Sequence, residues 1–302
     1  MVTNMTIKAR FDGCLVGLAC GDAVGTTVEF CARGTFEPLT DMVGGGPFKL
    51  EAGQWTDDTA MALCLAASLV ASKRFDPLDQ MQRYCRWRTE GYMSSTGRCV
   101  DIGNTVAQAL DHFVVTGNPL SGSSHERSAG NGSLMRLAPV PMFYYPELEN
   151  VVKYSGQSSG TTHGAAECVE ACQLFGALLV KAFNGLSKEA ILFTNDDDGY
   201  ECPSIAMIAK GGYRDKPAAA IFGSGYVVHS LEAALWSFYT TTNFKDAILA
   251  AANLGDDADT TAAICGQIAG AYYGVNEIPD AWKNQLAMRE TILGLSQALL
   301  GT

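Results

Sequence analysis

The chain has 302 residues, of which 47% are hydrophobic and 18% charged, and this composition excludes an intrinsically disordered protein. Its net charge of −11 and its scattered Lys and Arg residues also exclude the basic face that is usual in proteins that bind a nucleic-acid backbone. The densest basic cluster holds only Arg83, Arg86 and Arg88, so we expect no extended nucleic-acid surface.

The ten cysteines form no recognisable metal-ligand or disulfide pattern, because none of them belongs to a CxxC pair. Cys14, Cys64 and Cys265 lie within apolar stretches, where a reduced cysteine packs as a small hydrophobic residue. No N-terminal leader is recognised, and no apolar run reaches the roughly 18 residues that a membrane-spanning helix needs. We therefore expect a reduced, cytoplasmic location and no membrane partner.

Most of the chain shows the helical period of apolar residues, whereas period-two alternation is scarce. We predict helices over 59–72, 105–115, 165–183, 226–239, 245–253 and 260–273. Connections rich in Gly, Ser and Asp are predicted over 34–54, 116–133, 155–164, 194–201 and 211–225. None of them reads as a linker between domains. The expectation is one mainly α-helical, multi-helix domain over residues 1–302 with functional loops at one end.

Two short motifs resemble functional signatures but lack the required context. GGGPF (44–48) has neither the Lys nor the Ser or Thr of a phosphate-binding P-loop, so it is predicted to be a flexible loop. GQSSG (156–160) fits G-x-S-x-G, but no strand of a parallel sheet is predicted before it. A serine hydrolase is therefore not expected.

Two acidic turns, TDDTAMAL (56–63) and DADTTAAI (257–264), each begin an apolar helix. Helix capping is one interpretation, because Asp and Thr accept hydrogen bonds from the first free N–H groups of a helix. Capping explains a single aspartate, whereas crowded carboxylates repel one another and usually hold a cation. Hard divalent metals prefer the oxygen ligands that Asp and Thr provide. Metal binding and capping both remain open from these residues alone, with metal binding favoured.

Taken with the loops between them, these turns resemble motifs of the ADP-ribosylglycohydrolase family, most closely its dinitrogen-reductase-activating branch. The resemblance covers nearly the whole chain, in the same order. The motifs are GLACGDAVGTTVEF (17–30), GQWTDDTAMAL (53–63), VDIGNT (100–105), AGNGSLMR (129–136), TTHGAAE (161–167) and GDDADTTAAICGQIAGAYYGVNEIP (255–279). Each motif alone is weak, and the six in order are specific.

This resemblance implies an all-α fold with a binuclear site for two divalent cations, Mg²⁺ or Mn²⁺, at one pole. It places the metal ligands at the two helix starts, on Thr56, Asp57, Asp58, Asp257, Asp259 and Thr260. One departure is Gly255-Asp256-Asp257, where the family usually has Gly-Gly-Asp. Asp256 is not counted as a ligand, and its role is left open.

The resemblance also implies two catalytic carboxylates. Asp101 is the candidate for proton transfer in the arginine-directed branch, and Glu29 is the second acidic residue near the metals. Alternatives exist for both. Asp101 is also a candidate N-cap for the predicted helix 105–115, and Glu29 is also interpreted as a solvated loop acid.

Substrate contacts are expected from four segments. VDIGNT contributes Gly103 and Asn104, and the Gly-rich loop Gly130, Asn131, Gly132 and Ser133 offers backbone N–H groups to phosphate. His163 lies where the family has a ligand-lining histidine, and Tyr226 where an apolar or aromatic residue contacts the base. A structural histidine and a core tyrosine are the ordinary alternatives.

The resemblance implies metal-dependent hydrolysis of the N-glycosidic bond between ADP-ribose and a modified protein side chain, with arginine as the expected side chain and ADP-ribose as the product. Its transition state is oxocarbenium-like, as in sugar hydrolysis generally. Two alternatives stay open: the same fold acting on serine, nucleobase or O-acetyl-ADP-ribose linkages, and a non-catalytic relative that binds ADP-ribose. Six intact ligand positions favour an enzyme.

Overall fold

The computed structural model describes residues 5–193 and 199–301, and this part of the chain is all-α, with three isolated β-bridges and no strand. The α-helices are α1 (Ile7–Gly25), α2 (Asp57–Ser72), α3 (Pro77–Glu90), α4 (Asn104–Thr116), α5 (Pro139–Tyr144), α6 (Leu148–Gly160), α7 (Ala166–Phe183), α8 (Lys188–Leu192), α9 (Pro203–Ala209), α10 (Val227–Thr240), α11 (Phe244–Ala252), α12 (Ala258–Tyr273), α13 (Asp280–Gln285) and α14 (Arg289–Leu300). Short 3-10 turns join them: η1 (Thr26–Val28), η2 (Glu126–Ser128), η3 (Ala218–Ala220) and η4 (Val275–Glu277).

All six predicted helices are present, and each begins and ends within two residues of its predicted bounds. The prediction of a loop over 155–164 is wrong, because α6 continues to Gly160. Ser and Gly lower helix propensity there, but close packing against α7 overrides it: a Cβ on Gly156 would lie 2.9 Å from the Gln173 side chain. The predicted connection 194–201 lies largely outside the described residues.

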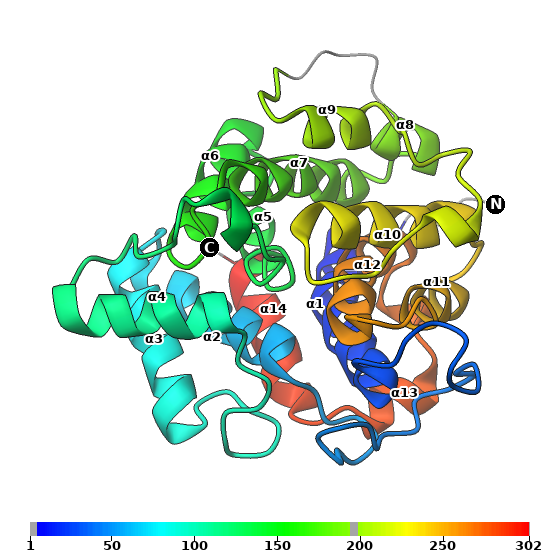
Figure 1. The fold of residues 1–302 in the computed structure, drawn as a ribbon, viewed down its shortest axis with the longest axis horizontal. Coiled ribbons are helices and arrows are strands. Elements are labelled where there is room, and N and C mark those ends of the chain that lie inside the picture. Colours follow the sequence, from blue (N-terminus) through cyan, green and yellow to red (C-terminus); the bar gives the residue numbers. More distant parts are fainter. Residues whose placement is uncertain (1–4, 194–198, 302) are drawn as a thin grey trace.

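Helices α1 and α12 lie side by side at the centre of the molecule (Figure 1). Their contact follows a glycine at every fourth position of α1, namely Gly13, Gly17, Gly21 and Gly25. This spacing puts the four glycines on one face of the helix, which therefore carries no side chains. A Cβ on Gly17 would lie 2.3 Å from the carbonyl oxygen of Gly266 in α12, and one on Gly21 would lie 2.1 Å from that of Ala262. The two backbones therefore touch, which a larger side chain would prevent.

One stretch, Ile7–Val28, is long and apolar enough to span a membrane by length and composition, contrary to the expectation that no such run exists. In the fold, 94% of its most apolar window is buried inside the protein. A core helix packed on all sides passes the same length and composition test, because it is hydrophobic all round.

The cysteines behave as predicted from their apolar surroundings. All ten are free thiols, and those of Cys14, Cys64 and Cys265 are buried.

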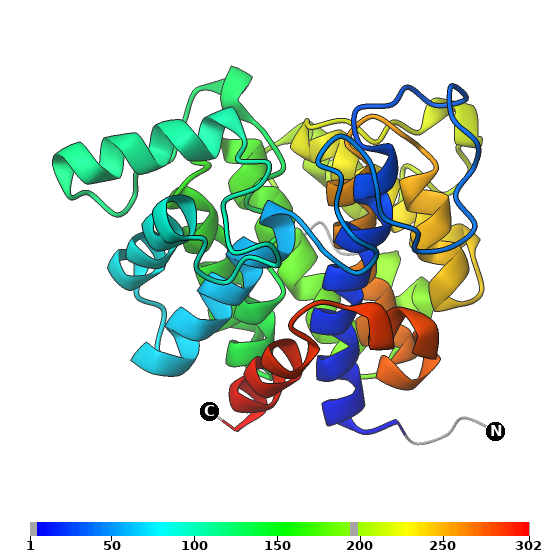
Figure 2. The ribbon, with the colours of Figure 1, turned by 90° about the horizontal axis from the view of Figure 1, so that it is seen from below.

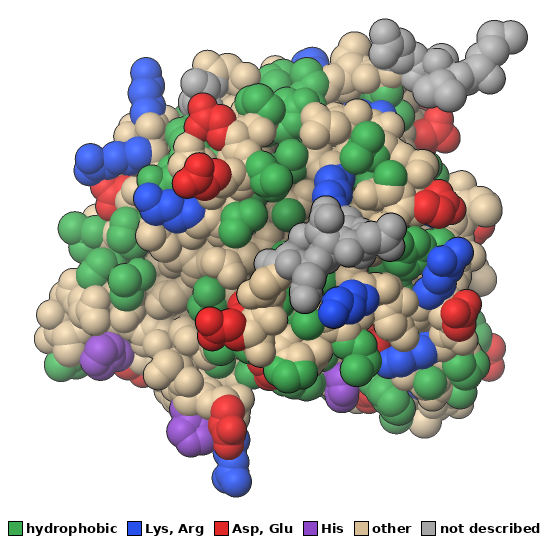
Figure 3. All heavy atoms as spheres, turned by 90° about the horizontal axis from the view of Figure 1, so that it is seen from above, with side chains coloured by type: hydrophobic (Ala, Val, Ile, Leu, Met, Phe, Trp, Pro, Cys, Tyr) green, Lys and Arg blue, Asp and Glu red, His purple; other side chains and the backbone are tan. Residues whose placement is uncertain are grey.

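On the face shown in Figure 3, the described Lys and Arg side chains are interspersed with acidic and hydrophobic ones. This face therefore presents no extended basic surface.

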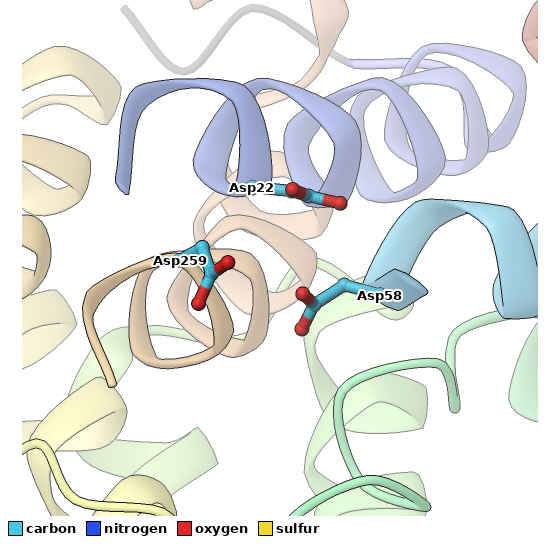
Figure 4. Close-up of side chains that lie close together, drawn as sticks. All are labelled: Asp22, Asp58 and Asp259. Carbon is cyan, nitrogen blue, oxygen red and sulfur yellow. The ribbon is translucent and has the colours of Figure 1, made fainter. Parts of the chain in front are cut away.

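The loops that form the site gather at one end of the molecule, whereas both chain ends lie at the opposite end (Figure 2). The C-terminus of α1 and the N-termini of α2 and α12 meet at the loop end (Figures 1 and 4). Helix α4 projects at the same end of the molecule (Figure 2).

Candidate functional site

Three carboxylates from three helices converge at the loop end. Asp22 comes from α1, Asp58 from α2 and Asp259 from α12, and one oxygen of each lies within 4.8 Å of the others (Figure 4). A second group, Glu29, Asp257 and Asp259, meets the same distance criterion. The two groups share Asp259, so the acidic turns predicted from the sequence form one continuous cluster.

Each acidic helix start is capped by a carboxylate from another segment. Asp22 accepts hydrogen bonds from the backbone N–H groups of Thr56 and Thr59 at 2.9 and 3.0 Å, and from both hydroxyls at 2.9 and 2.6 Å. Glu29 Oε2 accepts from the N–H groups of Ala258 and Asp259 at 2.8 and 3.2 Å.

These caps decide between the two interpretations of the acidic turns. At the N-cap positions of α2 and α12, Thr56 and Asp257 make no side-chain capping hydrogen bond. Asp57 and Asp58 follow Thr56 in the first turn of α2, where the N–H groups of Thr56 and Thr59 are already bonded to Asp22. Capping by the N-cap side chains therefore accounts for neither acidic turn, although Asp259 Oδ1 accepts from Thr260 N–H at 2.7 Å and Asp257 Oδ2 accepts from Asn131.

The electrostatics of the cluster favour a bound cation. Burial, followed by neighbouring carboxylates, raises the pKa values of Asp57, Asp58 and Asp259 well above their ordinary range. Within the described residues, no Lys or Arg forms an ion pair with any of them. In the part of the chain that the structure describes, the buried Oδ1 of Asp58 has no hydrogen-bond partner. A buried acceptor without a donor fits a hard divalent metal, whose preferred ligands are carboxylate and hydroxyl oxygens.

Asp256, the departure from the family pattern, lies on the outside of this cluster. Its side chain is exposed, and its backbone has a φ of 56°. Its N–H donates to the carbonyl of Cys31, and its own carbonyl accepts from Phe30 N–H, both at 2.8 Å. These bonds tie the second acidic turn to the segment that carries Glu29.

The cluster forms part of the floor of a cleft of about 370 Å³. The predicted site residues that line it are Glu29, Asp57, Asp101, Gly103, Asn104, Gly130, Asn131, Gly132, His163, Asp257 and Thr260. Thr56, Asp58 and Asp259 are buried and do not line it. Ser133 is also buried, with its hydroxyl bonded to Ser159.

Tyr226 also lies outside the cleft, but unlike the buried site residues it lies at the protein surface. It lines a shallower neighbouring pocket with Arg127, and its hydroxyl donates to Glu167 at 2.6 Å. With 36% of its surface exposed, it is not a core tyrosine.

The two candidate catalytic carboxylates occupy different environments. Asp101 is half-buried in the cleft wall with a φ of 58°, and burial followed by the negative charges of Asp257 and Asp22 raises its pKa to about 7. It is not a helix cap, because the N-cap of α4 is Gly103. Glu29 is 3% exposed, so it is not a solvated acid, and burial raises its pKa to about 9.

The Gly-rich loop offers fewer free amides than the sequence suggests. Gly130 N–H bonds to Ser128 and Asn131 N–H bonds to Gly225. Of the four amides, only those of Gly132 and Ser133 have no hydrogen-bond partner within the described residues. They begin the turn in which Leu134 and Met135 N–H bond back to the Asn131 carbonyl. Two adjacent N–H groups at the start of a helical turn attract an anion.

The side chain of Asn131 has a structural task that the motif did not reveal. Its amide nitrogen donates to Asp257 Oδ2 at 2.9 Å and to Ser230 Oγ at 2.8 Å. The Gly-rich loop therefore also orients a carboxylate of the second acidic turn.

A buried arginine under this loop orients His163. Arg136 is fully buried, and its Nη2 donates to Thr162 Oγ1 at 2.8 Å. The Thr162 hydroxyl lies 2.9 Å from His163 Nδ1, and because its oxygen already accepts from Arg136 we assign its hydrogen to Nδ1. Burial and Arg136 lower the His163 pKa to about 3, so the ring is neutral. From this network we assign its proton to Nε2.

His163 also explains why the loop needs glycine. A Cβ on Gly132 would lie 2.7 Å from His163 Cε1, and one on Gly130 would lie 3.3 Å from Nε2. The loop therefore lies directly against the imidazole ring.

Sequence reasoning missed Asp22 and Arg136, although both lie inside quoted motifs. Asp22 is a single charge in the apolar stretch GLACGDAVG, and Arg136 ends AGNGSLMR beside apolar residues. A lone ionisable residue in an apolar helix must find partners when it is buried. That signal was available in the sequence.

Three comparisons with known proteins agree with this geometry. The sequence model of the family described as ADP-ribosylglycohydrolase matches residues 3–302. ADP-ribosylarginine hydrolase Tri1 of Serratia proteamaculans is 44% identical over 95% of this chain and 78% of its own length. Tri1 of Pseudomonas putida is 47% identical over 96% and 77%.

A more distant relative and a solved structure extend the comparison. The ADP-ribosyl-[dinitrogen reductase] glycohydrolase of Rhodospirillum rubrum is 31% identical over 95% of this chain and 94% of its own. A structure titled "ADP-ribosylglycohydrolase-related protein complex" superimposes with a TM-score of 0.88 at 40% identity, covering 98% of both chains.

Proposed function

The chain belongs to the ADP-ribosylglycohydrolase family, and on that premise we propose that it hydrolyses the N-glycosidic bond between ADP-ribose and an arginine side chain of a modified protein. The observation that carries the proposal is the buried acidic cluster in the floor of a cleft lined by Asp101. The arginine linkage is supported by two relatives named as ADP-ribosylarginine hydrolases.

We infer two divalent ions, Mg²⁺ or Mn²⁺, because the acidic groups are two and share one carboxylate, Asp259. The residues proposed to hold them are those that the family resemblance implies, namely Thr56, Asp57, Asp58, Asp257, Asp259 and Thr260. Of these, Asp58, Asp257 and Asp259 belong to the two carboxylate groups, and Glu29 joins them. Such ions supply Lewis-acid chemistry when bound, since they orient oxygen ligands and lower the pKa of water. Asp22 is assigned to positioning, because both of its oxygens already accept two hydrogen bonds each.

Asp101 is the residue proposed to transfer the proton. Hydrolysis breaks the bond from the anomeric carbon to the guanidine nitrogen and forms a bond from that carbon to a water oxygen, while a proton moves from the water to the departing nitrogen. A carboxyl with a pKa of about 7 is populated in both protonation states at neutral pH, so it can accept one proton and donate another. Its place in the cleft wall supports this role.

The nucleotide half of the substrate is proposed to lie along the Gly-rich loop. The free amides of Gly132 and Ser133 suit a diphosphate oxygen. Arg136, buried beneath them, adds a positive charge that no carboxylate of the described chain neutralises. His163 presents Nε2–H as a donor on the same side of the cleft.

One assay tests the proposal: release of ADP-ribose from matched peptides linked through arginine or serine, and from a nucleobase-linked substrate, with Mg²⁺, with Mn²⁺ and with chelator. We expect arginine-linked ADP-ribose to be cleaved at least roughly tenfold faster than serine-linked, a gap of about 1.4 kcal/mol in the barrier. Chelator, Asp57→Ala and Asp259→Ala should each abolish turnover. Full activity in chelator would refute the metal-dependent site, and a preference for serine would refute the arginine assignment.

A further inference from the structure

The cleft opens toward a different shallow pocket on each of two sides. On one side it shares Gly130, Gly225 and Thr105 with the pocket that contains Tyr226. On another side it shares Asp101 with a pocket of about 340 Å³ lined by Pro47, Phe48, Arg98, Cys99 and Val100. Asp101 therefore stands between the reaction cleft and this second pocket, called below the Phe48 pocket.

The chemistry of ribose assigns a direction to these two openings. The diphosphate is attached through C5′, which is bonded to ring atom C4′. The leaving group is attached at the anomeric carbon C1′, on the other side of the ring oxygen. If the diphosphate follows the Gly-rich loop, the leaving group points away from it. Asp101, the proton-transfer residue, must contact that leaving group, and the Phe48 pocket continues beyond it.

The wall of the Phe48 pocket is a built element, contrary to the prediction of a flexible loop over GGGPF. Gly45 and Leu50 exchange two backbone hydrogen bonds, at 2.7 and 3.0 Å, to close a tight hairpin. The hairpin is anchored on η1: Thr27 Oγ1 donates to the Gly44 carbonyl, and a Cβ on Gly46 would lie 2.1 Å from Thr26 O. Pro47 and Phe48 are thereby held at its tip.

The lining of the Phe48 pocket combines charged and apolar side chains. Asp101 lies at the inner end, and Phe48, Pro47 and Val100 provide apolar surface. Arg98 is exposed, and its guanidinium makes no hydrogen bond or ion pair within the described residues. Phe48 also makes an edge contact with Phe30, an exposed cleft residue, at 6.1 Å between ring centroids.

We propose that the Phe48 pocket docks the polypeptide part of the substrate, with the arginine stem against Phe48 and an acidic residue beside the modified arginine against Arg98. This inference rests on the proposed function. A guanidinium favours carboxylates and aromatic faces, which the inner end supplies through Asp101, Phe48 and Phe30. Arg98 is the cation that lines this pocket, and in a chain of net charge −11 it selects a negative neighbour by charge complementarity.

The test compares three substrates: ADP-ribosyl-agmatine, and two peptides with one ADP-ribosylated arginine flanked by Asp or by Lys. We expect the unmodified enzyme to cleave the Asp-flanked peptide about threefold more efficiently than the Lys-flanked one, the size that an exposed ion pair allows. Arg98→Glu should invert this preference and leave kcat/KM for ADP-ribosyl-agmatine within twofold. Arg74→Glu makes the same charge change on a 74% exposed side chain beyond the C-terminus of α2, and it should leave the preference unchanged.

Phe48→Ala provides the second arm. It should lower kcat/KM about fivefold for all three substrates, while the inhibition constant of ADP-ribose, which has no leaving group, stays the same. A flank preference unchanged by Arg98→Glu, or shifted equally by Arg74→Glu, would overturn the docking proposal while arginine hydrolysis stands. If no arginine-linked substrate is cleaved by the unmodified enzyme, the proposed function fails and the docking proposal fails with it.

Discussion

The cap that Asp22 makes on α2 gives the sharpest prediction, and the change to make is Asp22→Asn. Each carboxylate oxygen of Asp22 accepts one backbone N–H and one hydroxyl. In asparagine one oxygen becomes an NH₂ group. The threonine hydroxyl on that side can rotate to accept from it, but the backbone N–H then faces another donor.

The magnitude follows from this loss. A hydrogen bond to a charged group contributes about 1.5–3 kcal/mol, and an unsatisfied buried N–H costs about 1–3 kcal/mol. We expect a loss of about 2–4 kcal/mol in the metal-saturated protein, which is about 4–10 °C in Tm. In chelator, removing one buried negative charge relieves repulsion with Asp58 and Asp259, so the loss is smaller. The increase in Tm that metal produces is therefore smaller in Asp22→Asn than in the unmodified protein.

The assay is thermal unfolding in chelator and in saturating Mg²⁺ or Mn²⁺, because a ligand that binds only the folded state raises Tm. Asp12→Asn is the matched control on the same helix. Asp12 is also buried, but it pairs with Lys8 and accepts from Ser296 Oγ at 2.8 Å, away from the acidic cluster. It should lower Tm equally with and without metal. A metal increment in Asp22→Asn equal to that of the unmodified protein would refute the positioning role.

Three further predictions follow from the site. Asp101→Asn should lower kcat at least about a hundredfold and change ADP-ribose affinity little; a joint collapse of rate, affinity and Tm would show a structural role instead. Thr162→Val should raise KM and shift the ¹⁵N resonances of His163 toward a mixture of tautomers, whereas Thr162→Ser should restore both; identical spectra for the two variants would contradict the assigned proton. Burial raises the pKa of Asp101 to about 7 and that of Glu29 to about 9. Above pH about 4 the folded metal-free protein therefore binds more protons than the unfolded chain. Its stability should fall from pH 5 to 9 for this reason. Metal should flatten this slope, and a Tm in chelator that rises with pH would be the contrary result.

Several of the helices that the sequence predicted have an apolar period that is strong enough to be recognised locally. α4 and α11 are examples, and both begin and end within one residue of their predicted bounds. α6 was not predicted to its end at Gly160, because its Ser- and Gly-rich last turns are stabilised by packing on α7. Local helix propensity carries no information about such a tertiary contact. The hairpin over GGGPF was not predicted for the same reason, since contacts with η1 hold it in place.

The acidic turns were visible in the sequence, but their capping partners were not. Asp22 and Glu29 lie more than 25 residues from the helix starts they cap, so no spacing rule connects them. The placement of Asp101 and His163 in one cleft likewise came only from the family resemblance, because a cleft is made by tertiary contacts. The residues alone predicted the chemistry of each acidic turn. They could not predict which distant residues cap the turn or share its cleft.

The distance between the two halves of the acidic cluster is a property of α1. Its glycine face brings the backbone of α12 into contact at Gly17, Gly21 and Gly25, and Asp22 lies within that same stretch. The residue that caps α2 is therefore carried by the same helix that docks α12. Any side chain at Gly21 would move α12 by its contact with the Ala262 carbonyl, and Asp259 would move with it relative to Asp58. The small residues of GLACGDAVG thus belong to the site as much as the carboxylates do, because they set the geometry in which the carboxylates meet.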